Sequence, residues 1–271
     1  MTKNLDTEGF RSVFDNYELF IIDLWGVVHN GIELHKNAIH TLSKITEAKK
    51  NYILLTNAPR PNEIVKIFLE NLGLDKSMSE NVFTSGEAAL GYLKKNYIGQ
   101  KFYHIGPPRD FDLFNDFKNK KTEDLDKSDY LLCTGLYDQH DQDLNYYKEL
   151  LKNFTSKKMV CTNPDLVVNK GKKREYCAGS VAMIFEKIGG EVIYFGKPYP
   201  EVYNQSITNN NKVIAIGDNL NTDIKGAINM NYDSLIITDG VHKEEIKRNG
   251  IEKVLLNYNV DATFSQSELK W

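Results

Sequence analysis

Residues 19–31 read LFIIDLWGVVHNG, and the expected fold follows from this stretch. Leu19–Ile22 form a continuous apolar run, which is typical of a strand in a parallel sheet that is covered on both faces. The run ends at Asp23, and Gly26 then lets the backbone turn tightly where a side chain would obstruct it. Because ligands of open α/β sheets bind beyond the carboxyl ends of the strands, we expect the Asp23 carboxylate to point toward a ligand. On its own, an Asp-x-x-Gly pattern is more often a turn or a helix cap.

Three more apolar runs end in polar groups, and their joint occurrence favours a functional site. The polar groups are Thr56-Asn57, Lys197 and Asp218. Separately, each is more simply explained as part of a turn or as a solvated side chain. Together with Asp23 they supply two carboxylates for a divalent cation such as Mg²⁺, a hydroxyl group for anion oxygens and a fixed positive charge. This combination suits phosphoryl transfer in which Asp23 itself attacks phosphorus and forms an aspartyl-phosphate.

The order of the expected strands and helices predicts an α/β fold with a doubly wound, parallel, Rossmann-like core. Strands and helices alternate up to about residue 95, polar segments lengthen between Gly99 and Gly190, and the alternation then returns. We interpret the middle region as a second α/β unit inserted into the first. The expected domains are a discontinuous core of residues 1–86 and 191–271 and an inserted domain of residues 87–190. Further strands are expected at residues 52–55, 82–84, 102–105, 130–134, 159–161, 191–195, 212–216 and 234–238.

The composition is that of an ordinary globular protein. Of the 271 residues, 41% are hydrophobic and 26% are charged, and the net charge of -3 argues against nucleic acid as a partner. The first 18 residues have no apolar signal segment, and no run is long enough to cross a membrane, so we expect a cytoplasmic protein without a membrane partner. The three cysteines, Cys133, Cys161 and Cys177, are too widely spaced to indicate a disulfide framework or a zinc site.

Four ordered motifs resemble those of the haloacid dehalogenase-type (HAD) hydrolases. They are Asp23-Leu24-Trp25-Gly26-Val27, Thr56-Asn57, Gly196-Lys197-Pro198 and Gly217-Asp218-Asn219-Leu220-Asn221-Thr222-Asp223. The insertion between the second and third motifs resembles the cap of class IIA, the branch of p-nitrophenyl phosphatases and of nucleotide, sugar-phosphate and pyridoxal-phosphate phosphatases. Thr162-Asn163-Pro164-Asp165 and Gly179-Ser180 resemble the end of that cap. The resemblance extends from Leu19 to Val241 and implies a phosphoric monoester hydrolase that acts on a small phosphorylated metabolite.

The resemblance also implies roles for individual residues around the phosphoryl group. Asp23 would be the nucleophile. Thr56 would bind the phosphoryl group with help from the Asn57 backbone. Lys197 would hold both Asp23 and the phosphate, and so would serve catalysis and substrate binding together.

The same resemblance implies a Mg²⁺ cofactor. Its ligands would be the carboxylates of Asp23 and Asp218 and the main-chain carbonyl of Trp25. Asp223 would support this corner of the site without being a ligand.

Trp25 is the one departure from the family pattern that bears on catalysis. Phosphatases of the family have a second Asp at this position, which protonates the leaving alcohol and later activates water. Indole can do neither, and a missing general acid or base typically lowers the rate by about 10²- to 10⁴-fold. Ligation of the metal by the Trp25 carbonyl does not depend on the side chain. We therefore expect an intact magnesium and phosphate site with weakened or altered turnover.

Three explanations of Trp25 remain open. The first is a hydrolase whose substrates have good leaving groups or whose acid/base group comes from elsewhere, with His29 on the following loop as the candidate. The second is a dehalogenase-like or phosphonatase-like enzyme, although dehalogenases do not use magnesium and Asp218 and Asp223 retain the metal motif. The third is a non-catalytic protein that binds a phosphorylated ligand. The sequence identifies neither the substrate nor the oligomeric state, and a homodimer stays open.

Overall fold

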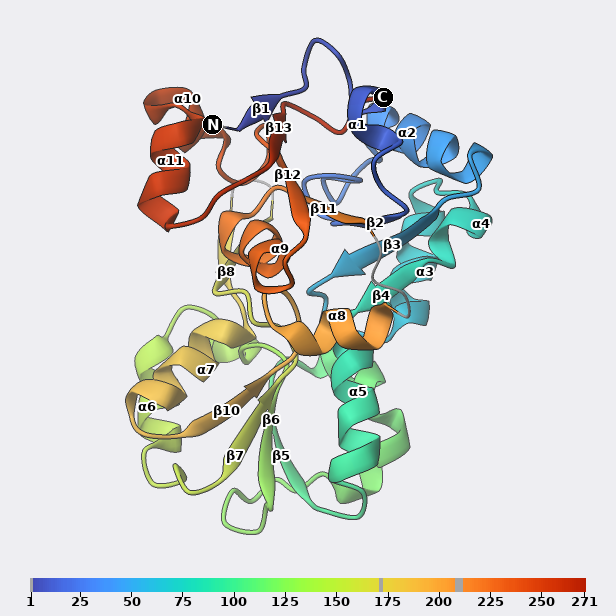
Figure 1. Ribbon diagram of the computed structural model, residues 1–271. Helices are drawn as coiled ribbons and strands as arrows, with labels where there is room; N and C mark the ends of the chain where they lie inside the picture. The colour runs from blue at the N-terminus through green and yellow to red at the C-terminus, as the bar shows by residue number, and fades with distance from the viewer. Residues whose placement is uncertain (1, 171–172, 208–211) are drawn as a thin grey trace. The chain divides into compact units, whose positions relative to one another are not determined.

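A computed structural model describes residues 2–170, 173–207 and 212–271, which fold into two compact units (Figure 1). The first unit comprises Met1–Thr56, Lys66–Phe83 and Lys197–Trp271, and the second comprises Asn57–Val65 and Thr84–Gly196. The chain thus passes from one unit to the other four times. Among the described residues, no helix combines the length and the apolar character that crossing a bilayer requires.

A seven-stranded sheet forms the centre of the first unit. Its strand order is β1-β13-β12-β11-β2-β3-β4, and the pairings from β1 through to β3 are parallel. The strands are β1 (Lys3–Asn4), β2 (Leu19–Ile22), β3 (Asn51–Thr56), β4 (Val82–Thr84), β11 (Val213–Gly217), β12 (Asp233–Ile237) and β13 (Phe264–Gln266). All residues of β2 and β11 are buried, as expected for central strands that are covered on both faces.

The strand order reverses between β2 and β11, and this point positions the site. From β2 the chain crosses to β3 through helix α2 (Lys36–Glu47), whereas from β11 it crosses in the other direction through η3 (Leu220–Ile224) and α9 (Lys225–Asn229). Right-handed crossovers in opposite directions place their helices on opposite faces of the sheet. The predicted doubly wound α/β fold is therefore confirmed, and ligands of such sheets bind where the order reverses.

Six more helices lie wholly or partly in the described part of the first unit. They are α1 (Arg11–Phe14), α3 (Asn62–Asn71), α4 (Lys76–Ser79), α8 (Pro200–Ser206), α10 (Lys243–Asn249) and α11 (Ile251–Tyr258). The boundary between the two units falls within α3. Helix α11 packs its Val254 and Leu255 against Leu220 and Ile236, in a cluster of buried side chains.

The second unit contains its own four-stranded parallel sheet, in the order β10-β7-β6-β5. Its elements are α5 (Ser85–Asn96), β5 (Phe102–Ile105), the 3₁₀ segments η1 (Pro108–Lys120) and η2 (Asp138–His140), β6 (Tyr130–Cys133), α6 (Leu144–Leu151), β7 (Lys158–Cys161), α7 (Ala178–Lys187) and β10 (Glu191–Tyr194). Two further strands, β8 (Val167–Lys170) and β9 (Lys173–Tyr176), pair antiparallel.

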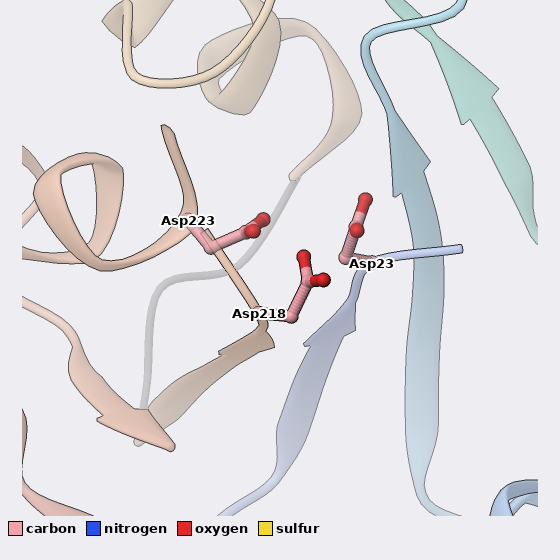
Figure 2. Close-up of side chains that lie close together, drawn as sticks. All are labelled: Asp23, Asp218 and Asp223. Atoms are coloured by element: carbon pink, nitrogen blue, oxygen red, sulfur yellow. The ribbon is translucent and has the colours of Figure 1, made fainter. Parts of the chain in front are cut away.

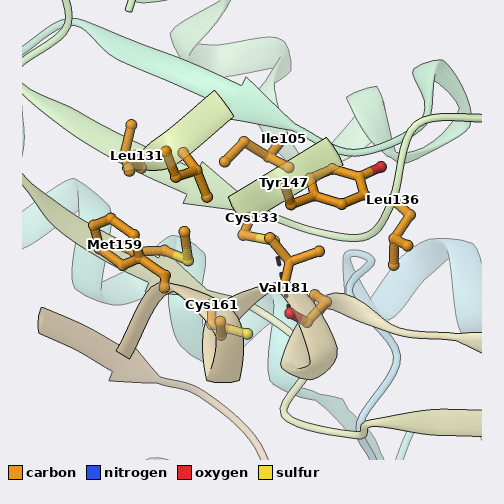
Figure 3. Close-up of a cluster of buried hydrophobic side chains, with 12 residues drawn as sticks. Ile105, Leu131, Cys133, Leu136, Tyr147, Met159, Cys161 and Val181 are labelled. Carbon is orange, nitrogen blue, oxygen red and sulfur yellow. Dashed lines mark hydrogen bonds between the residues drawn. The ribbon is translucent and has the colours of Figure 1, made fainter. Parts of the chain in front are cut away.

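The second unit has a hydrophobic core that is independent of the first (Figure 3). Leu131 and Met159 from neighbouring strands pack with Tyr147 of α6 and Val181 of α7, and all four side chains are fully buried. Cys133 and Cys161 are register partners within this core, and burial raises the pKa of both thiols. These cysteines therefore behave as small apolar side chains.

Two leucines of the first unit, one buried and one exposed, allow a test of its hydrophobic core. Leu235 on β12 is fully buried, whereas Leu256 on α11 is 77% exposed. We expect Leu235→Ala to lower the free energy of unfolding by about 2–5 kcal/mol because it leaves a cavity, and Leu256→Ala to change it by less than about 0.5 kcal/mol. Both tryptophans, Trp25 and Trp271, lie in this unit, so denaturation followed by tryptophan fluorescence reports on it. Equal losses in the two variants would contradict the assignment of Leu235 to the core.

Candidate active site

Three aspartates meet at the point where the strand order reverses (Figure 2). Asp23 follows β2, Asp218 follows β11, and Asp223 lies on η3. The register pairs Ile22 with Ile216, and the Asp23 amide donates to the Ile216 carbonyl at 2.8 Å, so the two strand ends are adjacent. All three carboxylates are buried and have oxygen atoms within 4.8 Å of one another. Oxygen donors gathered this closely are compatible with a divalent cation, which takes oxygen ligands.

Lys197 joins this carboxylate cluster. Its Nζ lies 2.5 Å from Oδ1 of Asp23 and 2.7 Å from Oδ1 of Asp223, and it donates to the Leu55 carbonyl at 2.9 Å. Burial by itself would lower the pKa of Lys197, but the charges of Asp223 and Asp23 together raise it. The lysine is therefore a permanent cation that is fixed in place by three acceptors.

When all three carboxylates are ionised, they carry more negative charge than Lys197 offsets. Burial raises the pKa of Asp23 well above its ordinary value, Lys197 lowers it, and the neighbouring aspartates raise it again. Burial and then the charge of Asp223 raise the pKa of Asp218 to about 7. Three buried carboxylates thus exceed the single charge of Lys197. A hard divalent cation fits this donor set, because it would stabilise the ionised form of each carboxylate.

Glycines let the backbone approach the carboxylates closely. Gly26 has a φ of +82°, and a Cβ there would lie 2.1 Å from Oδ2 of Asp218. A Cβ on Gly240 would lie 2.2 Å from the same oxygen, and the Val241 amide donates to it at 2.8 Å. Sequence reasoning identified Gly26 as a turn residue but missed Gly240 and Val241. The available signal was their position just after β12, another strand of the same parallel sheet.

The second motif is divided between the two units. Thr56 is the last residue of β3 and is buried, at the carboxyl end of the strand next to β2. Asn57 belongs to the second unit, where its Nδ2 donates to Oδ1 of Asp165 at 3.0 Å. A Cβ on Gly196 would lie 2.6 Å from Oδ1 of Asn57. The Asn57 side chain therefore organises residues near Asp165, and the predicted role of its backbone amide remains a prediction.

Trp25 and His29 pack against each other on the loop after Asp23. Their ring centroids lie 5.2 Å apart in an edge-to-face contact, and His29 makes a similar contact with Phe68 at 5.5 Å. Nδ1 of His29 accepts a hydrogen bond from the Gly31 amide at 2.9 Å. Burial lowers the pKa of His29 to about 4, so the ring is neutral at pH 7. The predicted acid/base role of His29 stays a prediction, while the observed contacts assign it a packing role beside Trp25.

Comparison with known proteins agrees with this geometry. Residues 20–118 match the family described as haloacid dehalogenase-like hydrolase, and residues 194–258 match the family described as HAD-hydrolase-like. Phosphoglycolate phosphatase 2 of Arabidopsis thaliana is 26% identical over an alignment of 272 positions, gaps included. The alignment covers 89% of this chain and 89% of that protein. An acid sugar phosphatase of Staphylococcus saprophyticus is 25% identical and is matched over 87% of this chain and 92% of its own.

A solved structure extends the comparison to three dimensions. The crystal structure of a haloacid dehalogenase-like hydrolase from Brucella suis aligns with a TM-score of 0.78 and 29% sequence identity, over 86% of this chain and 90% of that one. The two matched family ranges together cover more than half of the chain and contain Asp23, Lys197, Asp218 and Asp223. The chain belongs to the haloacid dehalogenase-like hydrolases, as its four motifs predict.

Proposed function

We propose that this chain is a magnesium-dependent phosphatase that hydrolyses a small phosphate monoester through an aspartyl-phosphate on Asp23. One observation carries the proposal: the buried Asp23 carboxylate is held by Lys197 and lies within 4.8 Å of the oxygens of Asp218 and Asp223. Relatives of similar length that are named phosphatases support it. We further propose that the inserted α/β unit is the cap and that it selects the substrate.

Lys197 orients the nucleophile in this proposal. It binds Oδ1 of Asp23, which presents the other carboxylate oxygen to phosphorus. The bond from Asp23 to phosphorus forms as the bond from phosphorus to the leaving oxygen breaks. Water then attacks the same phosphorus, which releases inorganic phosphate and regenerates the Asp23 carboxylate. The Thr56 hydroxyl and the amide that follows it would bind the phosphoryl oxygens during both steps.

Asp23, Asp218 and the Trp25 carbonyl would hold magnesium, and Asp223 would support Lys197 and the Asn219 amide beside them. Asp223 is suited to this role because its Oδ1 already accepts from Lys197 and its Oδ2 from the Asn219 amide at 3.1 Å. When bound, Mg²⁺ supplies positive charge that neutralises the transferring phosphoryl group. The carboxylate cluster also separates this proposal from a dehalogenase, which needs no metal.

The alternative function is that of a non-catalytic protein that binds a phosphorylated ligand. Trp25 is the observation that favours it, because an indole can neither protonate a leaving group nor activate water. The two functions share the same magnesium and phosphate site. They differ in whether phosphate is released, so turnover decides between them.

The first prediction from this proposed function concerns the nucleophile. Asp23→Asn should abolish magnesium-dependent release of phosphate from p-nitrophenyl phosphate, because an amide does not form a stable bond to phosphorus. The wild-type chain should release phosphate with magnesium and lose that activity in the presence of EDTA. If the wild-type chain binds magnesium and phosphate but releases none, the binding function replaces the catalytic one.

The second prediction concerns Gly26, with Gly73 as a matched control. Both glycines have left-handed backbones, with φ of +82° and +99°, but a Cβ on Gly73 would meet nothing within 4 Å. Gly26→Ala should raise the magnesium concentration needed for half-maximal activity by at least about tenfold, because its Cβ displaces the Asp218 carboxylate. Gly73→Ala has the same backbone strain, about 1–2 kcal/mol, and should leave that concentration unchanged. Equal magnesium requirements in the two variants would remove Asp218 from the metal site.

A further inference from the structure

Trp25 is held firmly on the loop that follows the nucleophile. A Cβ on Gly31 would lie 2.5 Å from the Cη2 atom of Trp25, so the indole rests directly on the Gly31 backbone. His29 contacts the indole edge-to-face, and Phe68 on α3 contacts His29 in the same way. The hydrogen bond from the Gly31 amide to Nδ1 of His29 fixes the orientation of that ring. These contacts pack the indole against the loop that carries it.

The same contacts leave apolar surface uncovered in the first unit. Trp25 is only partly buried, Phe68 is 39% exposed, and Ile32, next to Gly31, is 81% exposed. Single exposed hydrophobic side chains are common on protein surfaces, but partly exposed aromatic rings beside polar groups are typical of ligand sites. The backbone beside Trp25 is part of the site, because Gly26 lies against Asp218 and Asp23 is two residues away. An apolar ring is thus anchored at the position where the family places its proton donor.

The chemistry of the leaving group follows from this replacement. Without a proton donor, the leaving oxygen departs as an anion, and its own pKa determines how readily it leaves. Phenols have a pKa near 10, whereas the pKa of an alkanol is much higher and close to that of water. A general acid typically raises the rate by about 10²- to 10⁴-fold. Its absence slows the reaction of an alkyl ester more than that of an aryl ester.

We propose that Trp25 is a specificity-determining residue that selects phosphate monoesters of phenols and similarly acidic aromatic alcohols. The inference rests on the proposed phosphatase function and adds its substrate class. The indole offers the aromatic leaving group an edge or a face to pack on, and the phenolate leaves as an anion that takes its proton from bulk water. Asp23 receives the phosphoryl group in the same step.

The experiment compares ethyl, phenyl and p-nitrophenyl phosphate as substrates, with magnesium present. For the wild-type chain, kcat/KM should be at least about 100-fold higher for phenyl than for ethyl phosphate, and higher again for p-nitrophenyl phosphate. Equal values for phenyl and ethyl phosphate would overturn the inference but leave the proposed function standing. No phosphate from any ester, and no labelling of Asp23 by an aryl phosphate, would overturn the proposed function itself.

Three variants of Trp25 separate the missing acid from the aromatic contact. Trp25→Asp should raise activity on ethyl phosphate most, and so reduce the phenyl-to-ethyl ratio by about tenfold or more. Trp25→Ala should keep a steep dependence on the leaving group but raise KM for phenyl phosphate by about 2- to 10-fold, through loss of the ring contact. Trp25→Phe retains a ring and should raise that KM less than Trp25→Ala does. An unchanged KM in Trp25→Ala would show that the indole does not touch the substrate.

His29→Ala tests the competing explanation, in which His29 is the proton donor. If His29 only supports the indole, the ratio of kcat/KM for phenyl phosphate to kcat/KM for ethyl phosphate should stay at its wild-type value or fall in this variant. If His29 donates the proton, the wild-type ratio should be small and the variant should increase it by about 10²-fold or more. That second result would overturn the inference and return the acid role to His29.

Discussion

The ion pairs of Lys197 are the interactions on which the rest of the site depends. Asp23, Asp218 and Asp223 are buried together, and an uncompensated charge in such a place costs several kcal/mol. Lys197 offsets part of this cost by binding two of the carboxylates. Lys197 is also the residue at which the chain re-enters the first unit after the second. The chain therefore re-enters the first unit at a member of the cluster. The two parts of the second unit begin after Thr56 and end before Lys197, and both of these residues belong to the first unit.

The sheet determines which side chains can take part in the cluster. In a parallel sheet all strands end at the same edge, and the reversal of order between β2 and β11 opens a space at that edge for polar groups. This rule made Asp23, Thr56 and Asp218 predictable from apolar runs that end in polar residues. Apart from β1 and β13, it also predicted the strands of both sheets to within one or two residues, because buried parallel strands are continuously apolar.

Other features could not be predicted, for identifiable reasons. Strands β1 and β13 lie at the edge of the sheet and have only two and three residues, too few for a hydrophobic period. Helices α10 and α11 follow one another directly, with Gly250 between them, and their packing on Leu220 depends on tertiary structure. The hydrogen bond from the Val241 amide to Asp218 spans 23 positions. No local pattern in the sequence reports such a contact, and the same holds for the contact of His29 with Phe68.

Trp25 shows that backbone and side chain contribute separately to this loop. Gly26, with its left-handed φ, lies against Asp218 whatever side chain precedes it, and the amide of Gly26 donates to the His29 carbonyl at 2.8 Å. The turn that approaches the carboxylates is therefore preserved when the residue at position 25 changes. The side chain at position 25 is an indole that packs on Gly31 and His29, and the proposed replacement of a proton donor concerns this side chain alone. Under the proposed function, the chain keeps the charge cluster of the family and places a different demand on the leaving group.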